Sequence, residues 1–530
     1  MPRITIDGRP VEVEGGSTVL DAARRIGIEI PALCHYDGLP PNTSCLACLV
    51  KLEGHSRLLP SCATRVEEGM RVESEIPEVH EARRAALELL FADHVGDCRA
   101  PCQRICPLGL DVPLLLRRVR DGEVREAIAV VREAQPLPAV TGRICPAHCE
   151  QGCRRAVHDE AASIRAIERH VADTDLASGR PDLPTCAPSS GRRVAVIGAG
   201  PTGLAAVYFL LRQGQACTLY EARGQAGGML RELGESLPSE VLDAEIDVIR
   251  RMGAEIRLGT MVGRDLALDA LRAEFDSVLI AAGHQAEAPD WGVPRSAHGI
   301  QIAGHTHETG VPGLFAAGDV VRAQRRPVRA MAAGQSAAVA IGQYLAGQPI
   351  TGQRTVFVCS IGRLKDGEIE EFVKAADPPE VAADGGGGDA PADQAARQAA
   401  RCLHCDCRAA STCLLRSWGE RYGVLPSRHR VERRRVSILT DHPQVVFDPG
   451  KCILCGICIQ LAERAREELG LTFVGRGFDV RVAVPFERGL AEGLRTAAAS
   501  CVEACPTGAL AFRVDGGSPG AGSPGGGEGR

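Results

Sequence analysis

The chain has 530 residues, which is enough for about three or four domains. Hydrophobic residues make up 45% of it and support sizeable cores, while a net charge of -6 gives no hint of nucleic-acid binding. No apolar run approaches the ~18 residues of a membrane span, and the N-terminus lacks the apolar core of a signal peptide. We therefore expect a cytoplasmic protein, and its 22 cysteines point to metal ligation more than to disulfides.

Residues 1–92 begin with a predicted β-hairpin around Asp7 and Gly8, and a helix follows in TVLDAARRIG, which Ser17 or Thr18 can cap. Four cysteines come next and could converge from loops on one metal centre: Cys34, Cys45, Cys48 and Cys62. Thiolates are the ligands of a [2Fe–2S] cluster, but a four-cysteine zinc site has the same ligand count. The ligands alone leave both metals open.

The sequence around these cysteines resembles the N-terminal [2Fe–2S] domain of the complex I large iron–sulfur subunit and its relatives in hydrogenases and formate dehydrogenases. The segments that carry the resemblance are PALCHYDGLPPNTSCLACLV, LLPSCATRVEEGM and HEARRAALELLFADH. The resemblance covers the whole of residues 1–92. It implies a β-grasp, ferredoxin-like domain in which the four cysteines hold a [2Fe–2S] cluster.

Residues 93–185 contain six cysteines in two groups, HVGDCRAPCQRICP and GRICPAHCEQGC, with two predicted helices between them. The segment resembles the helical iron–sulfur domain shared by the glutamate synthase small subunit and dihydropyrimidine dehydrogenase. Carried over, the resemblance implies two [4Fe–4S] clusters. One has the ligands Cys98, Cys102 and Cys153, and the other Cys106, Cys145, Cys149 and, from the following helix, Glu168.

The first of these clusters departs from the family pattern, because the family's cysteine just before Cys98 is absent. His94 is the candidate replacement, since a His-x3-Cys unit also follows the [2Fe–2S] domain in complex I-type subunits. The alternative is a capping or surface histidine.

Residues 186–362 contain RVAVIGAGPTG, in which an apolar strand leads into Gly198, Gly200 and Gly203, followed by a helix and a second strand. The first glycine permits the tight turn, the second lets the backbone approach a pyrophosphate, and the third lets helix and strand pack closely. Glu221 ends the second strand about 20 residues on, where a ribose hydroxyl partner is expected. The pattern predicts a Rossmann-like dinucleotide site that includes Pro201 at the helix start.

Later motifs of this segment resemble the flavin part of the same reductase family. Gly227 and Gly228 in ARGQAGGMLR match its second loop near the flavin, and GLFAAGDVV supplies Gly318 and Asp319. The resemblance implies FAD, with Asp319 on the ribityl chain and the helix from Pro327 pointing at the isoalloxazine. The alternative is a first unit that binds NAD.

A second Rossmann unit of that family is missing from this sequence. The family inserts it between the segments matched by VLIAAGH and GLFAAGD, but only roughly thirty residues join them here, about the length of one βαβ unit. No glycine fingerprint occurs in them. We therefore expect no dedicated nicotinamide-binding domain, although NAD(P)H could still approach the flavin.

Residues 375–396 are rich in Pro, Gly and Asp and predict a flexible linker. Residues 397–430 follow with four thiols in a short span, Cys402, Cys405, Cys407 and Cys413, which favour either an iron–sulfur cluster or zinc. His404 could replace one of them.

Residues 440–514 resemble the bacterial-type ferredoxin domain of complex I and formate dehydrogenase subunits, through DPGKCILCGICIQLAE and CVEACPTGAL. Ala462 stands where the first run needs its fourth cysteine, so one [4Fe–4S] cluster survives, on Cys452, Cys455, Cys458 and Cys505. The remaining cysteines are expected to be structural thiols: Cys186, Cys217, Cys359 and Cys501. Residues 515–530 predict a disordered tail.

Together these patterns predict a multidomain α+β and α/β protein that contains FAD, one [2Fe–2S] cluster and several [4Fe–4S] clusters. We expect an oxidoreductase subunit that transfers electrons between the flavin and the clusters, to or from a partner redox protein. No catalytic acid, base or nucleophile is singled out. The alternatives are a complete NAD(P)H-dependent reductase of the glutamate synthase small-subunit type, and a scaffold that only connects clusters.

Overall fold

The computed structural model describes residues 1–530 except 285–288, 324–325, 355, 377–391, 430–431 and 514–530. The chain forms two compact units. Unit 1 consists of Met1–Arg99, Val356–Ala375 and Cys405–Arg530, and unit 2 consists of Ala100–Thr355 and Ala376–His404. The predicted tail and residues 377–391 of the predicted linker lie outside the described residues. The linker's two ends are helical, in α13 (Glu368–Ala375) and α14 (Ala392–Ala400).

The N-terminal part of unit 1 is a five-stranded mixed sheet in the order β2-β1-β5-β3-β4. Its strands are β1 (Arg3–Ile6), β2 (Arg9–Glu12), β3 (Leu49–Leu52), β4 (Leu58–Pro60) and β5 (Arg71–Glu73). The predicted hairpin is confirmed: β1 and β2 pair antiparallel, and Asp7 and Gly8 between them both have positive φ. Helix α1 (Val19–Arg25) has Thr18 as its N-cap, in a reciprocal capping box with Asp21.

The rest of unit 1 contains the long helix α2 (Pro77–Ala92) and short elements from the C-terminal third of the chain. Two antiparallel ladders are formed by β13 (Val445–Phe447) with β16 (Leu510–Phe512) and by β14 (Thr472–Val474) with β15 (Arg481–Ala483). The helices are α15 (Leu414–Arg421), α16 (Ile457–Arg464), α17 (Leu490–Gly493) and α18 (Ala498–Ala504). One apolar core joins α2, these elements and the loop of Cys34 and Cys45.

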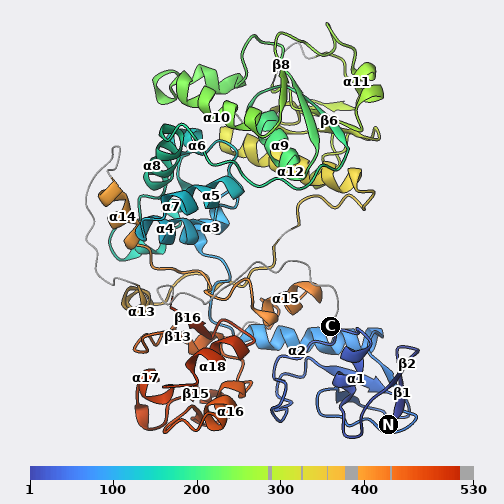
Figure 1. The fold of residues 1–530 in the computed structure, drawn as a ribbon, viewed down its shortest axis with the longest axis vertical. Coiled ribbons are helices and arrows are strands. Elements are labelled where there is room, and N and C mark those ends of the chain that lie inside the picture. The colour runs from blue at the N-terminus through green and yellow to red at the C-terminus, as the bar shows by residue number, and fades with distance from the viewer. Residues whose placement is uncertain (285–288, 324–325, 355, 377–391, 430–431, 514–530) are drawn as a thin grey trace. The chain divides into compact units, whose positions relative to one another are not determined.

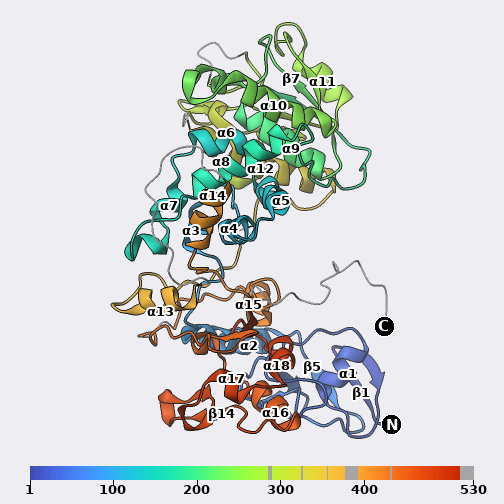
Figure 2. The same ribbon diagram turned by 60° about the vertical axis from the view of Figure 1, so that its left-hand side comes forward.

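Unit 2 begins with a group of helices: α3 (Pro101–Ile105), α4 (Val112–Arg120), α5 (Val124–Ala134), α6 (Pro138–Ile144), α7 (His148–Gln151) and α8 (Ile164–Ala177). The two helices predicted between the cysteine groups are confirmed as α4 and α5. Helix α14 packs against α4 and α8 although it lies far along the chain, as both views show (Figures 1 and 2). A segment expected to follow the flavin part therefore completes the helical part.

The flavin part of unit 2 is a parallel five-stranded sheet in the order β12-β9-β6-β7-β8. The strands are β6 (Arg193–Ile197), β7 (Ala216–Tyr220), β8 (Glu255–Arg257), β9 (Ser277–Ile280) and β12 (Leu314–Ala316). Helices α9 (Pro201–Arg212) and α12 (Pro327–Leu345) pack together beside it (Figure 1), because Gly334 lets α12 approach the Thr202 carbonyl. Helices α10 (Ser239–Arg251) and α11 (Leu268–Glu274) lie in the connections. This is the doubly wound order of dinucleotide-binding folds.

A buried ion network joins the helical part of unit 2 to the flavin part. The Arg132 guanidinium donates to Asp175 at 2.8 Å and to Glu245 of α10 at 3.2 Å. Glu245 also accepts from the backbone N–H of Ala139 at 2.6 Å, and the Tyr208 hydroxyl of α9 donates to the Arg132 carbonyl at 2.5 Å. Arg132, Glu245 and Asp175 are all buried, so each charge depends on its partners.

Between β9 and β12, the strands formed by the described residues are β10 (Arg295–Ser296) and β11 (Gly299–Ile300), which pair as a two-stranded ladder, and a short 3-10 helix covers Gly304–Thr306. The described residues of this stretch contain no second parallel sheet. Among the helices that the structure describes, none is both long enough and apolar enough to cross a membrane.

Candidate functional site

The glycine loop after β6 is shaped by close backbone contacts. Gly198 has φ +106° and lies so close to β9 that a Cβ would meet the Ala281 carbonyl oxygen at 2.5 Å. A Cβ on Gly203 would come within 1.9 Å of the Gly198 carbonyl oxygen, whereas one on Gly200 would meet no atom within 4 Å. Gly198 thus permits the turn beside β9, and Gly203 permits the close packing of α9 on the loop. Gly200 leaves open space at the start of α9. Such space beside a helix N-terminus suits a pyrophosphate.

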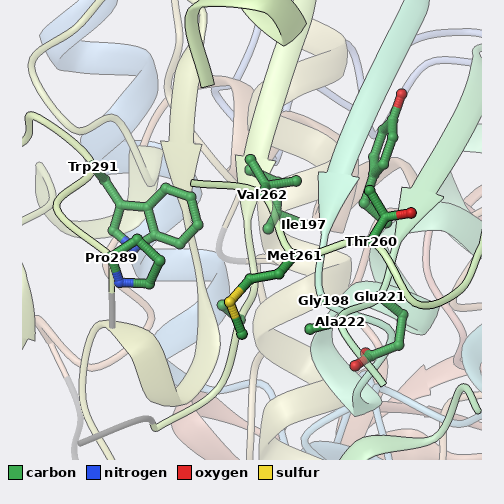
Figure 3. Close-up of a pocket in the computed structure, with 11 residues that line it drawn as sticks. Ile197, Gly198, Glu221, Ala222, Thr260, Met261, Val262, Pro289 and Trp291 are labelled. Atoms are coloured by element: carbon green, nitrogen blue, oxygen red, sulfur yellow. The ribbon is translucent and has the colours of Figure 1, made fainter. Parts of the chain in front are cut away.

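Glu221 at the end of β7 is buried and holds the loop in place. Its carboxylate accepts from the backbone N–H groups of Ala199 at 2.8 Å and of Arg223 at 2.9 Å. The same residue lines a pocket with Gly198, on the side facing Trp291 and Pro289 (Figure 3). An acidic side chain beside the pocket and next to the glycine turn is the arrangement that a ribose hydroxyl needs.

Sequence reasoning missed the opposite wall of this pocket, which Trp291 and Pro289 help to form (Figure 3). Trp291 is buried, and among the described residues its indole N–H has no hydrogen-bond partner. Both Pro289 and Trp291 belong to the short segment that replaces the second Rossmann unit. The tryptophan in that segment was the one available signal.

The second glycine loop lies against the first. A Cβ on Gly228 would meet the Gly200 Cα at 2.9 Å. Gly318 has φ +78°, and a Cβ on it would lie 2.3 Å from the Thr202 hydroxyl oxygen. Both predicted residues therefore lie beside the start of α9, where Pro201 is the first helical residue. Asp319 follows Gly318 in the turn that leads toward α12.

The first four cysteines are arranged as two pairs of buried thiols. Cys34 and Cys45 have their sulfurs 3.3 Å apart, and Cys48 and Cys62 have theirs 3.4 Å apart. The hydrogen bond with Cys45 lowers the pKa of Cys34 to about 5, and the bond with Cys62 lowers that of Cys48 to about 7. Two thiols on each of two irons is the ligand pattern of a [2Fe–2S] cluster, so the residues fit that group.

The Glu168 carboxylate raises the pKa of three thiols of unit 2: those of Cys106, Cys145 and Cys149. Burial, together with the Glu168 carboxylate and the Cys106 thiol, raises the pKa of Cys145 to about 11. The same two groups also raise the pKa of Cys149 after burial. Glu168 accepts from the Thr141 hydroxyl at 2.5 Å, and burial raises the pKa of its carboxyl to about 7. A carboxylate facing three thiols fits a cluster with one oxygen ligand.

The four cysteines of the ferredoxin-like segment line one cavity, together with Phe447, Ile457 and Val482. Burial raises the pKa of Cys452 to about 11 and that of Cys455 to about 12, and in each case Cys505 adds to the rise. Burial also raises the pKa of Cys458, and the Cys505 thiol is among the further causes of the rise. An enclosed apolar cavity bordered by four thiols fits a single [4Fe–4S] cluster.

The remaining predicted ligands are divided between the two units. Cys98 belongs to unit 1, and Cys102 and Cys153 belong to unit 2. The four thiols of residues 397–430 are divided as well: Cys402 falls in unit 2, and the other three fall in unit 1, namely Cys405, Cys407 and Cys413. Among the described residues, no three His, Cys, Asp or Glu side chains are placed to hold a single metal ion. Ligands of a four-iron cluster stand farther apart than those of one ion, because each binds a different iron.

Three family models match successive parts of the chain. Residues 2–77 match a 2Fe-2S iron-sulfur cluster binding domain, and residues 73–180 match dihydropyrimidine dehydrogenase domain II, 4Fe-4S cluster. Residues 154–337 match pyridine nucleotide-disulphide oxidoreductase.

Curated relatives match over part of their length. The chain is 38% identical over 212 residues to the NADP(+)-dependent formate dehydrogenase subunit beta of Moorella thermoacetica, which covers 36% of this chain and 30% of that one. It is 35% identical over 195 residues to the NADPH-Fe(3+) oxidoreductase subunit beta of Geobacter sulfurreducens, covering 36% and 29%. The glutamate synthase [NADPH] small chain of Mycobacterium tuberculosis is 37% identical over 190 residues, covering 35% and 39%.

These matches span about a third of each relative's length. A solved NAD+-reducing [NiFe]-hydrogenase in the H2-reduced state covers 97% of this chain and 89% of its own, but at 13% identity and a TM-score of 0.35. The three domain types confirm the predicted cofactor classes: FAD, [2Fe–2S] and [4Fe–4S]. The chain combines a 2Fe-2S cluster domain, a dihydropyrimidine dehydrogenase-type 4Fe-4S domain and a pyridine nucleotide-disulphide oxidoreductase domain.

Proposed function

We propose that this chain is an iron–sulfur flavoprotein oxidoreductase subunit that exchanges electrons with a partner redox protein through its clusters. The observation that carries the proposal is the flavin part itself. Its parallel sheet keeps both glycine loops and Glu221, but the strands that the described residues add between β9 and β12 are the short ladder of β10 with β11. A hydride donor would find the flavin pocket without the second cradle that orients a nicotinamide.

When bound, FAD accepts two electrons together or one at a time, and an iron–sulfur cluster accepts one, so a chain with both converts between the two modes. The residues contribute binding and orientation. The open space at Gly200 and the start of α9 would receive the pyrophosphate, and Glu221 would meet the adenosine ribose. Trp291 would close the pocket against water and offers its unpartnered indole N–H to the bound group.

The ligand sets and sub-folds belong to this proposal. The mixed sheet with α1 supports a β-grasp domain at residues 1–92, and the paired thiols support its [2Fe–2S] ligation by Cys34, Cys45, Cys48 and Cys62. The helices of unit 2 support a double-cluster domain at 93–185, and the parallel sheet supports a Rossmann-like FAD domain at 186–362. The cavity of Cys452, Cys455, Cys458 and Cys505 supports a ferredoxin-like segment at 440–514.

The second candidate is an NAD(P)H-dependent reductase of the glutamate synthase small-chain type. The names of three relatives favour it: two of these names contain NADPH and the third contains NADP(+). For this candidate, the nicotinamide would have to bind without a dedicated sheet among the described residues. Alternatively, a partner subunit would supply such a sheet.

The deciding experiment mixes the oxidised, FAD-loaded protein anaerobically with NADH, with NADPH and with a reduced one-electron carrier such as methyl viologen. The flavin absorbance near its visible maximum is followed by stopped flow. We expect fast bleaching with the viologen, and bleaching by either nucleotide at least tenfold slower and not saturating at micromolar concentration.

Rapid and saturable reduction by micromolar NADPH would overturn the proposal and establish the second candidate. The matched control is the Gly200→Ala variant loaded to whatever extent it binds FAD. Its viologen-driven cluster reduction should persist while its flavin signal shrinks, which separates loss of flavin from loss of electron entry.

A further inference from the structure

The described part of the segment between β9 and β12 packs on the flavin part of unit 2 at two points. At the first point, a Cβ on Gly263 would meet the Pro289 Cβ at 2.7 Å, so Pro289 lies directly on the turn that follows the pocket residues. At the second, a Cβ on Gly299 would lie 2.2 Å from the Val320 carbonyl oxygen, in the turn that contains Asp319. The segment therefore contacts the protein both near the dinucleotide pocket and at the turn expected to bind the ribityl chain.

Trp291 lies in the chain between these two points and belongs both to the core and to the pocket. Only 4% of the residue is exposed, and it packs in one apolar core with Ile197 and Val262. It also lines the pocket that Glu221 borders, and Figure 3 shows it beside Pro289, on the side away from Glu221. Packing on the sheet thus fixes an aromatic ring at the border of the pocket.

The indole N–H of Trp291 is a buried donor without a hydrogen-bond partner among the described residues. A buried donor that lacks a partner is costly, and a phenylalanine would fill a core without that cost. The choice of tryptophan therefore indicates that a group bound in the pocket supplies the acceptor.

The order of groups in FAD predicts which of them meets Trp291. The adenosine ribose of FAD carries the pyrophosphate at one end and the adenine at the other. With the pyrophosphate at Gly200 and the ribose at Glu221, the adenine extends to the side of the pocket that Trp291 and Pro289 border. Adenine has flat faces that stack on aromatic rings, and its ring nitrogens accept hydrogen bonds.

We propose that Trp291 stacks on the adenine of FAD and donates its indole N–H to that base, so that this short segment makes the chain select FAD over FMN. FMN ends at a single phosphate and offers Trp291 no base. The inference rests on the proposed function and deepens it, because it names the residue that holds the cofactor's adenosine end.

The first measurement uses tryptophan emission from the full chain with its clusters in place and its flavin removed. The chain has two tryptophans, so Trp418→Phe leaves Trp291 as the only one. We expect ADP to change the Trp291 emission saturably and FAD to compete with ADP, whereas FMN should not compete. NADH and NADPH contain the same adenosine diphosphate group, and FAD should displace ADP at lower concentrations than either of them.

The second measurement compares the affinities of Trp291 variants for flavins. Trp291→Ala should weaken the binding of FAD and of ADP about tenfold, as expected when a base loses its stacking ring. Trp291→Phe keeps an aromatic face and should lose less, and FMN should bind equally to both variants and to the unaltered chain.

The matched control is Trp418→Phe, which removes the tryptophan of α15 in unit 1 and should leave FAD affinity unchanged. Because Trp291 also packs in the core, far-UV circular dichroism and the thermal midpoint of each flavin-free variant show whether it is folded. A purely structural role would lower that midpoint without changing the preference for FAD over FMN.

Three results would overturn the inference. One is a folded Trp291→Ala variant with unchanged FAD affinity, and another is Trp291 emission that does not respond to ADP at concentrations that displace FAD. The third is displacement of ADP by NADH or NADPH at lower concentrations than by FAD, which would assign the pocket to a nicotinamide dinucleotide. These are binding measurements without electron transfer, so failure here is distinguishable from failure of the proposed function, which flavin bleaching decides.

Discussion

The dinucleotide pocket of unit 2 is shaped by backbone contacts around its glycine loop, whereas the thiol sites of unit 1 are made by side chains. In the pocket, the β6 strand, the glycine loop and α9 follow one another, and backbone contacts within a few ångströms set the shape. In unit 1, sulfur atoms define each site: the Cys34 and Cys45 sulfurs lie 3.3 Å apart, and four further thiols line the cavity of the ferredoxin-like segment. Variants of the glycine loop should therefore lose the cofactor through steric clashes with the backbone. Variants of the thiol sites should lose it because a ligand is removed.

The largest expected effect comes from the ion network that fastens the helical part of unit 2 to its flavin part. Arg132→Met would leave Asp175 and Glu245 buried without their cation. Breaking a buried pair costs about 3–5 kcal/mol, so we expect the free energy of unfolding of unit 2 to fall by that amount. Chemical denaturation followed by flavin fluorescence measures it.

The control is Arg192→Met, which removes a half-exposed ion pair with Asp276 and should cost about 0–1 kcal/mol. We expect the [2Fe–2S] signal of unit 1 to survive in Arg132→Met, because the ion network lies in unit 2. Loss of that signal together with the flavin would show that the two units do not respond separately.

A pair of glycine variants separates packing from binding in the pocket. Gly203→Ala forces a Cβ to within 1.9 Å of the Gly198 carbonyl, so we expect about 1–3 kcal/mol of destabilisation and loss of flavin. Gly200→Ala meets no atom of the protein within 4 Å, so its thermal midpoint should be unchanged while FAD affinity falls at least tenfold. Calorimetry and flavin titration measure the two effects. Equal destabilisation by both would show that the open space at Gly200 is not a ligand site.

The smallest effect is expected at α1, which lies beside the paired thiols without supplying one. Thr18→Ala removes the N-cap and its capping box with Asp21, at a cost of about 1 kcal/mol. The iron content and the [2Fe–2S] spectrum should be unchanged, because the ligands lie on the loops. Thermal unfolding with parallel iron analysis tests this, and Thr5→Ala, on the exposed face of β1, serves as a control.

The sequence alone determined the elements whose signals are local. The Gly198–Gly203 loop, the hairpin at Asp7, the Thr18 cap and the ferredoxin-like cysteines could all be predicted, because each depends on spacing within one short segment or on a family motif.

The tertiary structure decided what depends on segments meeting across the chain. The packing of α14 on α4 and the pocket wall formed by Trp291 leave no periodic or spaced signal in the sequence. Cys98 and Cys102 are close in the chain, but the fold places Cys98 in unit 1 and Cys102 in unit 2. Ligands are chosen by where the folded backbone places each sulfur, and that is set by burial and packing of the whole unit.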